Sequence, residues 1–305
     1  MEINHRHGLY LPAHDLWLDP QKAQPFAYVS HGHSDHTARH KAFFSTPETA
    51  AIMRQRLGGN RREQTAVFGE RTELCGGKAT LLSAGHVLGA AQMFFESDAG
   101  SMLYTGDFKL RPSLSVPPAQ WCKADTLVME TTFGLPKYRM PPTADVLAAL
   151  LAWCREQLAD GTTPILFAYS LGKAQELVCA LIAAGLTPML HETAWKMCEL
   201  YREFLPAFPT TYRRWKPSEQ AGHVVIWPHT RDTGELDRRF GKYRAAAFPL
   251  SDHADYDELL RAVELVQPKR VLTVHGFAAE FAADLRRRGV EAWALAQENQ
   301  MELRL

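Results

Sequence analysis

The sequence predicts an α/β protein in which two rhythms of secondary structure follow one another. In the first half, short apolar runs alternate with polar turns, which is typical of strands. After Pro141-Pro142, strand-like and helix-like runs alternate, and this order favours a small parallel sheet with helices. At 305 residues, of which 46% are hydrophobic, the chain can form one large or two medium domains with a sizeable core.

The first half contains several predicted strands, and polar candidates for a site follow most of them. Residues 97–100, Ser-Asp-Ala-Gly, have the composition of a hairpin turn. Because side chains at strand ends project beyond a sheet while the strands hold them rigidly, we expect the chemistry there. The predicted strands are 26–30, 79–83, 92–96, 101–105 and 125–130.

The second half begins with a predicted helix. Thr143 is the expected N-cap, apolar residues recur at helical spacing as far as Leu158, and Gly161 ends the run. The remaining predicted strands are 164–168, 187–190, 223–227, 244–248, 270–274 and 291–295, and the remaining helices are 174–184, 194–204, 256–266 and 278–288.

Composition limits the class of partner and the compartment. Lys+Arg and Asp+Glu are both 34, so an anionic substrate needs a local patch or bound metal rather than a global positive charge. The five cysteines form no C-x-x-C pair, which indicates reduced thiols in a cytosolic protein. No signal-like segment and no apolar run of about 20 residues are present, so we expect a cytoplasmic protein without membrane attachment.

The most informative segment is the loop His31-Gly32-His33-Ser34-Asp35-His36, which directly follows an apolar run. Neutral imidazole and carboxylate are the ligands that zinc prefers, and this loop offers more of them than one ion needs from one segment. If the strand continues into His31 and His33, both rings point the same way and can bind one ion. Asp35 and His36 lie beyond the bend and can reach a second ion.

Further candidate ligands follow strands elsewhere, and Asp107 among them is suited to bridge two ions. We therefore expect two divalent ions about 3.5–4 Å apart that clamp a phosphate or another tetrahedral group. Zinc is favoured by the number of histidines, and manganese also accepts these ligands. The predicted metal ligands are His31, His33, Asp35, His36, His86, Asp107 and His275.

The order of these ligands resembles the motif series of the metallo-β-lactamase fold. The series is the loop His31–His36, then His86, then Asp107. Asp19 matches the early aspartate of that fold, and the resemblance implies that it orients the ligand loop. The implied architecture is an αββα sandwich.

Three more motifs resemble those of the β-CASP nucleases within that fold. Glu130 fits the first motif, His253 the second and His275-Gly276 the third. The resemblance implies that His253 protonates the leaving oxygen or stabilises charge on the phosphate, while Glu130 sets its tautomer and raises its basicity. Asp35 joins Glu130 and His253 in the implied catalytic set.

The resemblance also implies the domain organisation and the activity. The metallo-β-lactamase domain would comprise 1–135 and 250–305, and the β-CASP α/β domain would be inserted at 136–249. Segments 83–89 and 167–175 look like those of bacterial ligase-associated DNA exonucleases. This implies a metal-dependent DNA exonuclease in DNA repair, in which hydroxide activated by two metals cleaves phosphodiester bonds. An ATP-dependent DNA ligase and a helicase are the implied partners.

Other functions stay open at this point. The eukaryotic DNA-cutting members lack the histidine that ends the third motif, whereas this chain keeps His275 as the RNA-cutting members do. A β-CASP ribonuclease in RNA processing is therefore the alternative. A catalytically silent binding subunit would be expected to have lost ligands, and none is missing here. A small-molecule hydrolase of this fold would not need the insert, Glu130 or His253.

The run Ser170-Leu171-Gly172-Lys173 predicts a phosphate contact. It follows a predicted strand and opens a predicted helix, so backbone N–H groups, a hydroxyl and an ammonium would converge at a helix N-terminus. The run lacks the glycine spacing of a P-loop, which argues against nucleotide hydrolysis. Ser170, Gly172 and Lys173 are the predicted phosphate-binding residues, and a requirement for a 5′-phosphate would fit them.

Overall fold

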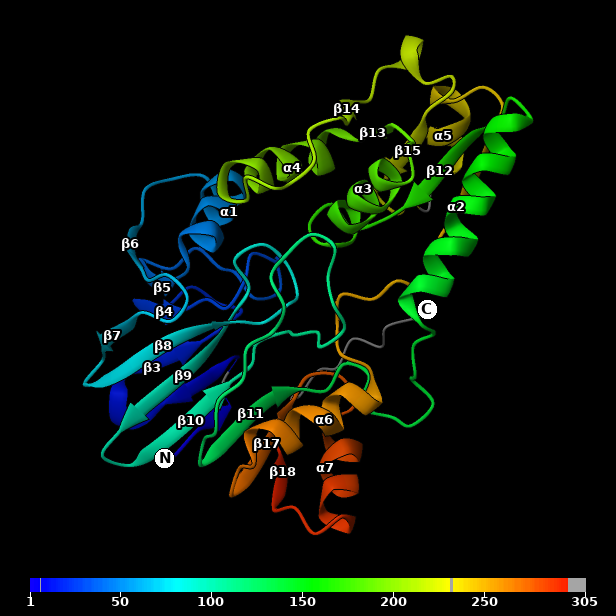
Figure 1. Cartoon of the computed structure of the whole chain (residues 1–305). Helices are drawn as coiled ribbons and strands as arrows, with labels where there is room; N and C mark the ends of the chain where they lie inside the picture. The colour runs from blue at the N-terminus through cyan, green and yellow to red at the C-terminus, as the bar shows by residue number, and fades with distance from the viewer. Residues whose placement is uncertain (6, 231–232, 296–305) are drawn as a thin grey trace. The chain divides into compact units, whose positions relative to one another are not determined.

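The computed structural model describes residues 1–5, 7–230 and 233–295, and the chain divides into two compact units (Figure 1). Unit 1 comprises Met1–Arg139 together with Asp252–Leu305, and unit 2 comprises Met140–Ser251. The chain therefore leaves unit 1 once and returns to it, with unit 2 as the insertion. The insert at 136–249 stays a prediction, and the compact units divide at Arg139–Met140 and Ser251–Asp252.

Unit 1 is built on two β-sheets. Among the described residues, one sheet has the order β1-β2-β3-β4-β5-β6 and the other the order β18-β17-β11-β10-β9-β8-β7. The late strands β17 and β18 extend the second sheet in parallel from β11, so the last part of the chain completes it. The strands are β1 (Asn4–His5), β2 (Leu9–Leu11), β3 (Leu16–Leu18), β4 (Phe26–Tyr28), β5 (Ala42–Ser45), β6 (Arg62–Thr65), β7 (Arg71–Leu74), β8 (Gly77–Ser83), β9 (Ala91–Ser97), β10 (Gly100–Tyr104), β11 (Thr126–Glu130), β17 (Arg270–Val274) and β18 (Ala292–Ala294).

One apolar cluster fills the space between these sheets. It includes Tyr28 and Phe44 from the first sheet and Phe95 and Tyr104 from the second, all of them buried. Successive residues of a strand point to opposite faces, so Phe43 lies on the outer face of the first sheet. The two sheets therefore pack face to face as a sandwich.

Helices cover both outer faces of the sandwich. Met53 of α1 (Pro47–Leu57) packs against Phe43 on the first sheet. On the second sheet, α6 (Tyr256–Val266) and α7 (Ala278–Arg287) run beside β17 and β18 (Figure 1). A short 3-10 helix, η1 (Pro12–His14), joins β2 to β3. The layers follow the αββα order that the resemblance implies.

Unit 2 contains the parallel layer that the alternating pattern predicts. Its sheet has the order β14-β13-β15-β12-β16, and the paired strands run parallel. Buried side chains of β12 and β15, including Ile165 and Trp227, pack against Phe240. The elements are α2 (Thr143–Ala159), β12 (Thr163–Phe167), α3 (Lys173–Ala183), β13 (Pro188–Leu190), α4 (Glu192–Phe204), β14 (Arg213–Arg214), η2 (Pro217–Glu219), β15 (Val224–Trp227), α5 (Thr233–Arg239) and β16 (Tyr243–Ala246).

Two local predictions are wrong. Thr143 is the first residue of α2 rather than its cap, because Pro142 occupies the N-cap position without a side-chain hydrogen bond. The strand predicted at 26–30 ends at Tyr28, before the histidine loop. No helix of the described ranges has both the length and the apolar character needed to cross a membrane.

Candidate metal centre

The histidine loop leaves the sheet after β4, so the strand does not continue into His31 and His33, which was the condition for both rings to point the same way. Asp19 instead fixes the start of the histidine loop. Its Oδ1 accepts a hydrogen bond from the Ser30 backbone N–H at 2.7 Å, and its Oδ2 accepts one from the Ser30 hydroxyl. Gly32 packs tightly against α1, where a Cβ would lie 2.4 Å from Cγ2 of Ile52. Hydrogen bonds and close packing, rather than strand geometry, therefore shape this loop.

Four predicted ligands converge in one compact group. Nδ1 of His33 lies 3.1 Å from Nε2 of His31 and 3.1 Å from Nε2 of His86. Oδ2 of Asp107 lies 3.5 Å from the same His31 atom and 3.9 Å from that of His86. A tetrahedral zinc ion with ligands at 2.0–2.1 Å spaces its ligand atoms about 3.3 Å apart. The donor set and its spacing therefore fit a divalent ion.

The predicted ligands of the second ion are less closely grouped than those of the first. Nε2 of His36 lies 3.3 Å from Oδ2 of Asp107, so this carboxylate oxygen faces both groups. Oδ2 of Asp35 lies 3.8 Å from His36 Nε2 on a side chain that is 71% exposed. The ring centroids of His36 and His275 are 5.5 Å apart. Among the described residues, the compact ligand groups include neither Asp35 nor His275.

Burial and charge set the protonation of these groups. Burial lowers the pKa of His31 well below its usual value and that of His86 to about 3, so both imidazoles are neutral, as metal ligands must be. Burial would also lower the pKa of His36, but Asp107 and Asp19 raise it well above the usual range. A metal ion would take the place of the proton shared by His36 and Asp107.

Hydrogen bonds to the far side of two rings direct their Nε2 atoms into the site. Nδ1 of His36 donates to Oδ2 of Asp19 at 2.9 Å, and the same oxygen accepts from the Tyr104 hydroxyl at 2.8 Å. Nδ1 of His86 lies 2.7 Å from the backbone oxygen of Asp252 and donates to it. Such partners fix the tautomer and orientation of metal-binding histidines.

A histidine–carboxylate pair lies beside the ligand groups. Nδ1 of His253 is 3.1 and 3.2 Å from the two carboxylate oxygens of Glu130, which is fully buried. Glu130 also accepts from the Phe108 N–H at 3.0 Å and from the Thr132 hydroxyl. Burial would lower the pKa of His253, but Glu130 and Asp107 raise it to about 10. The pair therefore presents a protonated imidazole whose ring is 4.9 Å from that of His86.

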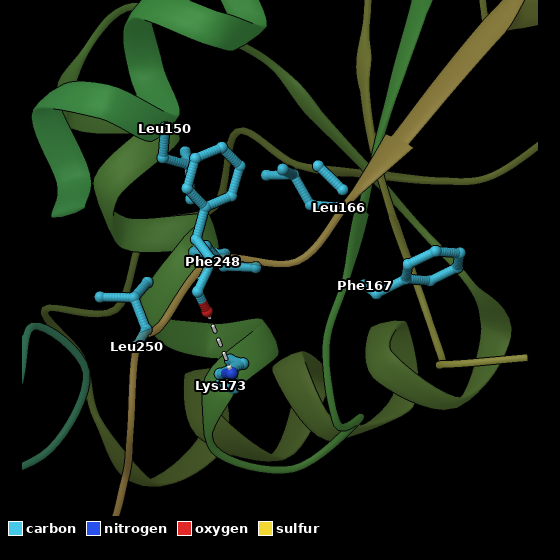
Figure 2. Close-up of a pocket in the computed structure, with 8 residues that line it drawn as sticks. Leu150, Leu166, Phe167, Lys173, Phe248 and Leu250 are labelled. Carbon is cyan, nitrogen blue, oxygen red and sulfur yellow. Dashed lines mark hydrogen bonds between the residues drawn. The ribbon is translucent and has the colours of Figure 1, made fainter. Parts of the chain in front are cut away.

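The predicted phosphate contact lies in unit 2. The Gly172 N–H donates to the side chain of Gln175 at 2.7 Å, and the Ala174 N–H donates to the Tyr169 carbonyl at 3.1 Å. Figure 2 shows the ammonium of Lys173 directed at the Phe248 carbonyl, 3.5 Å away, among apolar side chains. Two of the amides expected to face a phosphate thus have partners within the chain, and the phosphate contact stays a prediction.

Sequence reasoning missed several residues that support the centre. Thr132 follows Glu130 by two residues and Ser30 directly precedes His31, so their positions in the motifs were the available signal. The carbonyl of Asp252 and the hydroxyl of Tyr104 give no such signal, because their contacts span 166 and 85 residues.

Comparison with known proteins agrees with this geometry. A family model described as "Zn-dependent metallo-hydrolase RNA specificity domain" matches residues 242–295. The chain is 46% identical to the "Probable DNA ligase" of Opitutus terrae, over 99% of this chain and 32% of that protein. It is 26% identical to the "5' exonuclease Apollo" of Gallus gallus, over 81% of this chain and 58% of that protein. It is 28% identical to the "RNase J-like protein" of Methanocaldococcus jannaschii, over 52% of this chain and 43% of that protein.

A solved structure supports the fold. A protein of unknown function from Enterococcus faecalis V583 superposes with a TM-score of 0.62 at 12% identity, covering 90% of this chain and 80% of that one. The layers and the ligand groups define a protein of the metallo-β-lactamase fold with an inserted domain. Within that class, the family model and the relatives support a β-CASP nuclease. It spans only part of the length of each of the three relatives.

Proposed function

We propose that the protein is a metal-dependent DNA exonuclease that hydrolyses phosphodiester bonds in DNA repair. The observation that carries this proposal is the His253–Glu130 pair beside a compact group of side chains that could hold a divalent ion. A site built only to bind metal would not need a buried carboxylate that holds a protonated imidazole. A centre that expels an alkoxide from a phosphodiester needs bound metal and also a positioned proton donor.

Each ligand group has a role in this proposal. His31, His33, His86 and Asp107 would hold one ion, while Asp35, His36 and His275 would hold a second together with Asp107. Two divalent ions there would stabilise the charge that develops on the phosphate and lower the pKa of water, and zinc best suits the donors.

His253 would act on the leaving group. Glu130 occupies the Nδ1 side of the ring, so Nε2 is the atom that can give a proton to the leaving oxygen. The side chain of His253 is 23% exposed, which allows a substrate to reach it. The buried charge of Glu130 keeps the imidazole protonated until the oxygen leaves. Glu130 therefore orients and charges the group that donates the proton.

DNA is the proposed substrate because one relative is named a 5' exonuclease and another a probable DNA ligase. The ligase-named relative matches nearly all of this chain over about a third of its own length, which supports an ATP-dependent DNA ligase as partner. A helicase partner follows from the family resemblance alone. RNA remains the second candidate, since the matched family model is described as an RNA specificity domain.

The test uses DNA and RNA of one sequence, labelled at either end and incubated with the protein and Zn²⁺ or Mn²⁺. The proposal predicts a ladder of shortened DNA from one end and little change in the RNA. Digestion of RNA alone would replace the proposal with the ribonuclease. Internal cuts in DNA without a ladder would contradict the exonuclease assignment.

A further inference from the structure

Thr131 contacts the segment that carries His275 through every polar atom it has. Its N–H donates to the Val274 carbonyl at 2.9 Å, which continues the pairing of β11 with β17. Its carbonyl accepts from the Phe277 N–H at 2.8 Å. Its hydroxyl reaches the carbonyl of Val274 at 3.1 Å and that of His275 at 2.6 Å. Thr131 is fully buried, so water does not compete for these contacts.

The segment that Thr131 contacts has an unusual backbone. His275 has a φ of 59°, in the left-handed region that a residue with a Cβ rarely adopts. Gly276 follows with a φ of 54°, and a Cβ there would lie 2.3 Å from the carbonyl oxygen of Thr131. Such a conformation persists only where its surroundings impose it. The Thr131 hydroxyl donates to the carbonyl of His275 at 2.6 Å.

The backbone conformation of His275 determines the direction in which its imidazole points. Leaving the strand geometry at His275 turns its ring to within 5.5 Å of the His36 ring, on the side of the looser ligand group. In that group His36 is held by Asp19, whereas the Asp35 side chain is largely exposed. The tighter group, around His33, does not contain His275.

We propose that Thr131 is a positioning residue for the second metal ion. Its hydroxyl holds His275 in the left-handed conformation, and this conformation presents the imidazole to the second ligand group. The inference rests on the two-ion centre of the proposed function. It assigns to the strand end Glu130-Thr131-Thr132 a second task, because Glu130 and Thr132 order His253 while Thr131 orders His275.

The experiment measures metal binding directly. Metal-free wild type, Thr131→Val and Thr131→Ser are titrated with Zn²⁺ in a competing chelator, and bound metal is counted by elemental analysis. Valine keeps the shape of threonine without the hydroxyl, and serine restores the hydroxyl. We expect Thr131→Val to weaken the second equivalent of zinc by about 10–100-fold and to leave the first unchanged. Thr131→Ser should bind both equivalents like the wild type.

Thr273→Val is the matched control. Thr273 is also fully buried, on β17, the strand that precedes His275, and its hydroxyl donates to the Ala278 carbonyl at 2.7 Å. Loss of this hydroxyl should lower the free energy of unfolding measured in urea without changing metal binding. The inference is overturned if the wild type and Thr131→Val both bind two ions equally well, or if Thr273→Val weakens the second ion as much as Thr131→Val does. A wild type that binds only one ion would refute the two-ion centre itself, and the role of Thr131 with it.

Discussion

Replacing His253 with alanine should lower kcat on DNA by about 10²–10⁴-fold, the usual contribution of a positioned proton donor. This corresponds to about 3–5 kcal/mol of transition-state stabilisation. The metal content should be unchanged, because the His253 ring pairs with Glu130 through Nδ1 at 3.1 Å and is not one of the proposed metal ligands. Glu130 keeps its bond from the Phe108 N–H, so the fold should also persist.

The assay pairs turnover of end-labelled DNA with metal analysis of the same sample. His223→Ala, in unit 2, is the control for loss of a histidine outside the centre and should match the wild type in both measurements. Metal loss from His253→Ala in proportion to its loss of activity would refute the proton-donor role, because it would make His253 a ligand. A loss of activity below tenfold would refute it as well.

Three further changes test the surrounding groups. Glu130→Gln keeps the shape but removes a charged hydrogen bond worth about 1.5–3 kcal/mol, so kcat should fall about 10–150-fold at unchanged metal content; an unchanged kcat would contradict the pairing with His253. Asp19→Asn should weaken metal binding about 10–100-fold in chelator competition, since Asp19 accepts from His36 Nδ1; wild-type affinity would show that this contact does not matter. Lys173→Ala should slow digestion of 5′-phosphorylated DNA more than that of DNA with a 5′-hydroxyl; equal slowing would remove the predicted phosphate contact.

The sequence predicted those parts of the fold whose local pattern is strong. The helix expected at 256–266 and the strand expected at 270–274 match α6 and β17, because each has a clear period and clear ends. The strands β1, β2 and β3 were not predicted, since runs of two or three residues are too short for alternation to appear. Pairing with neighbouring strands, rather than local propensity, makes them strands.

The sequence indicates candidate members of the site but not their geometry. Histidines and acids at strand ends indicated the ligands, and the structure brings His31, His33, His86 and Asp107 together. The difference between a tight first group and a loose second group could not be predicted. It depends on how exposed Asp35 is and on the backbone at His275, which are set by long-range contacts.

The most direct test of the two-ion nuclease is the rate of DNA digestion as metal-free protein is titrated with Mn²⁺ or Zn²⁺. The structure and the proposed chemistry predict that the rate rises steeply with the second equivalent and levels off once two ions per chain are bound. A rate that reaches its full value at one equivalent, or protein that leaves DNA intact with two ions bound, would contradict the account.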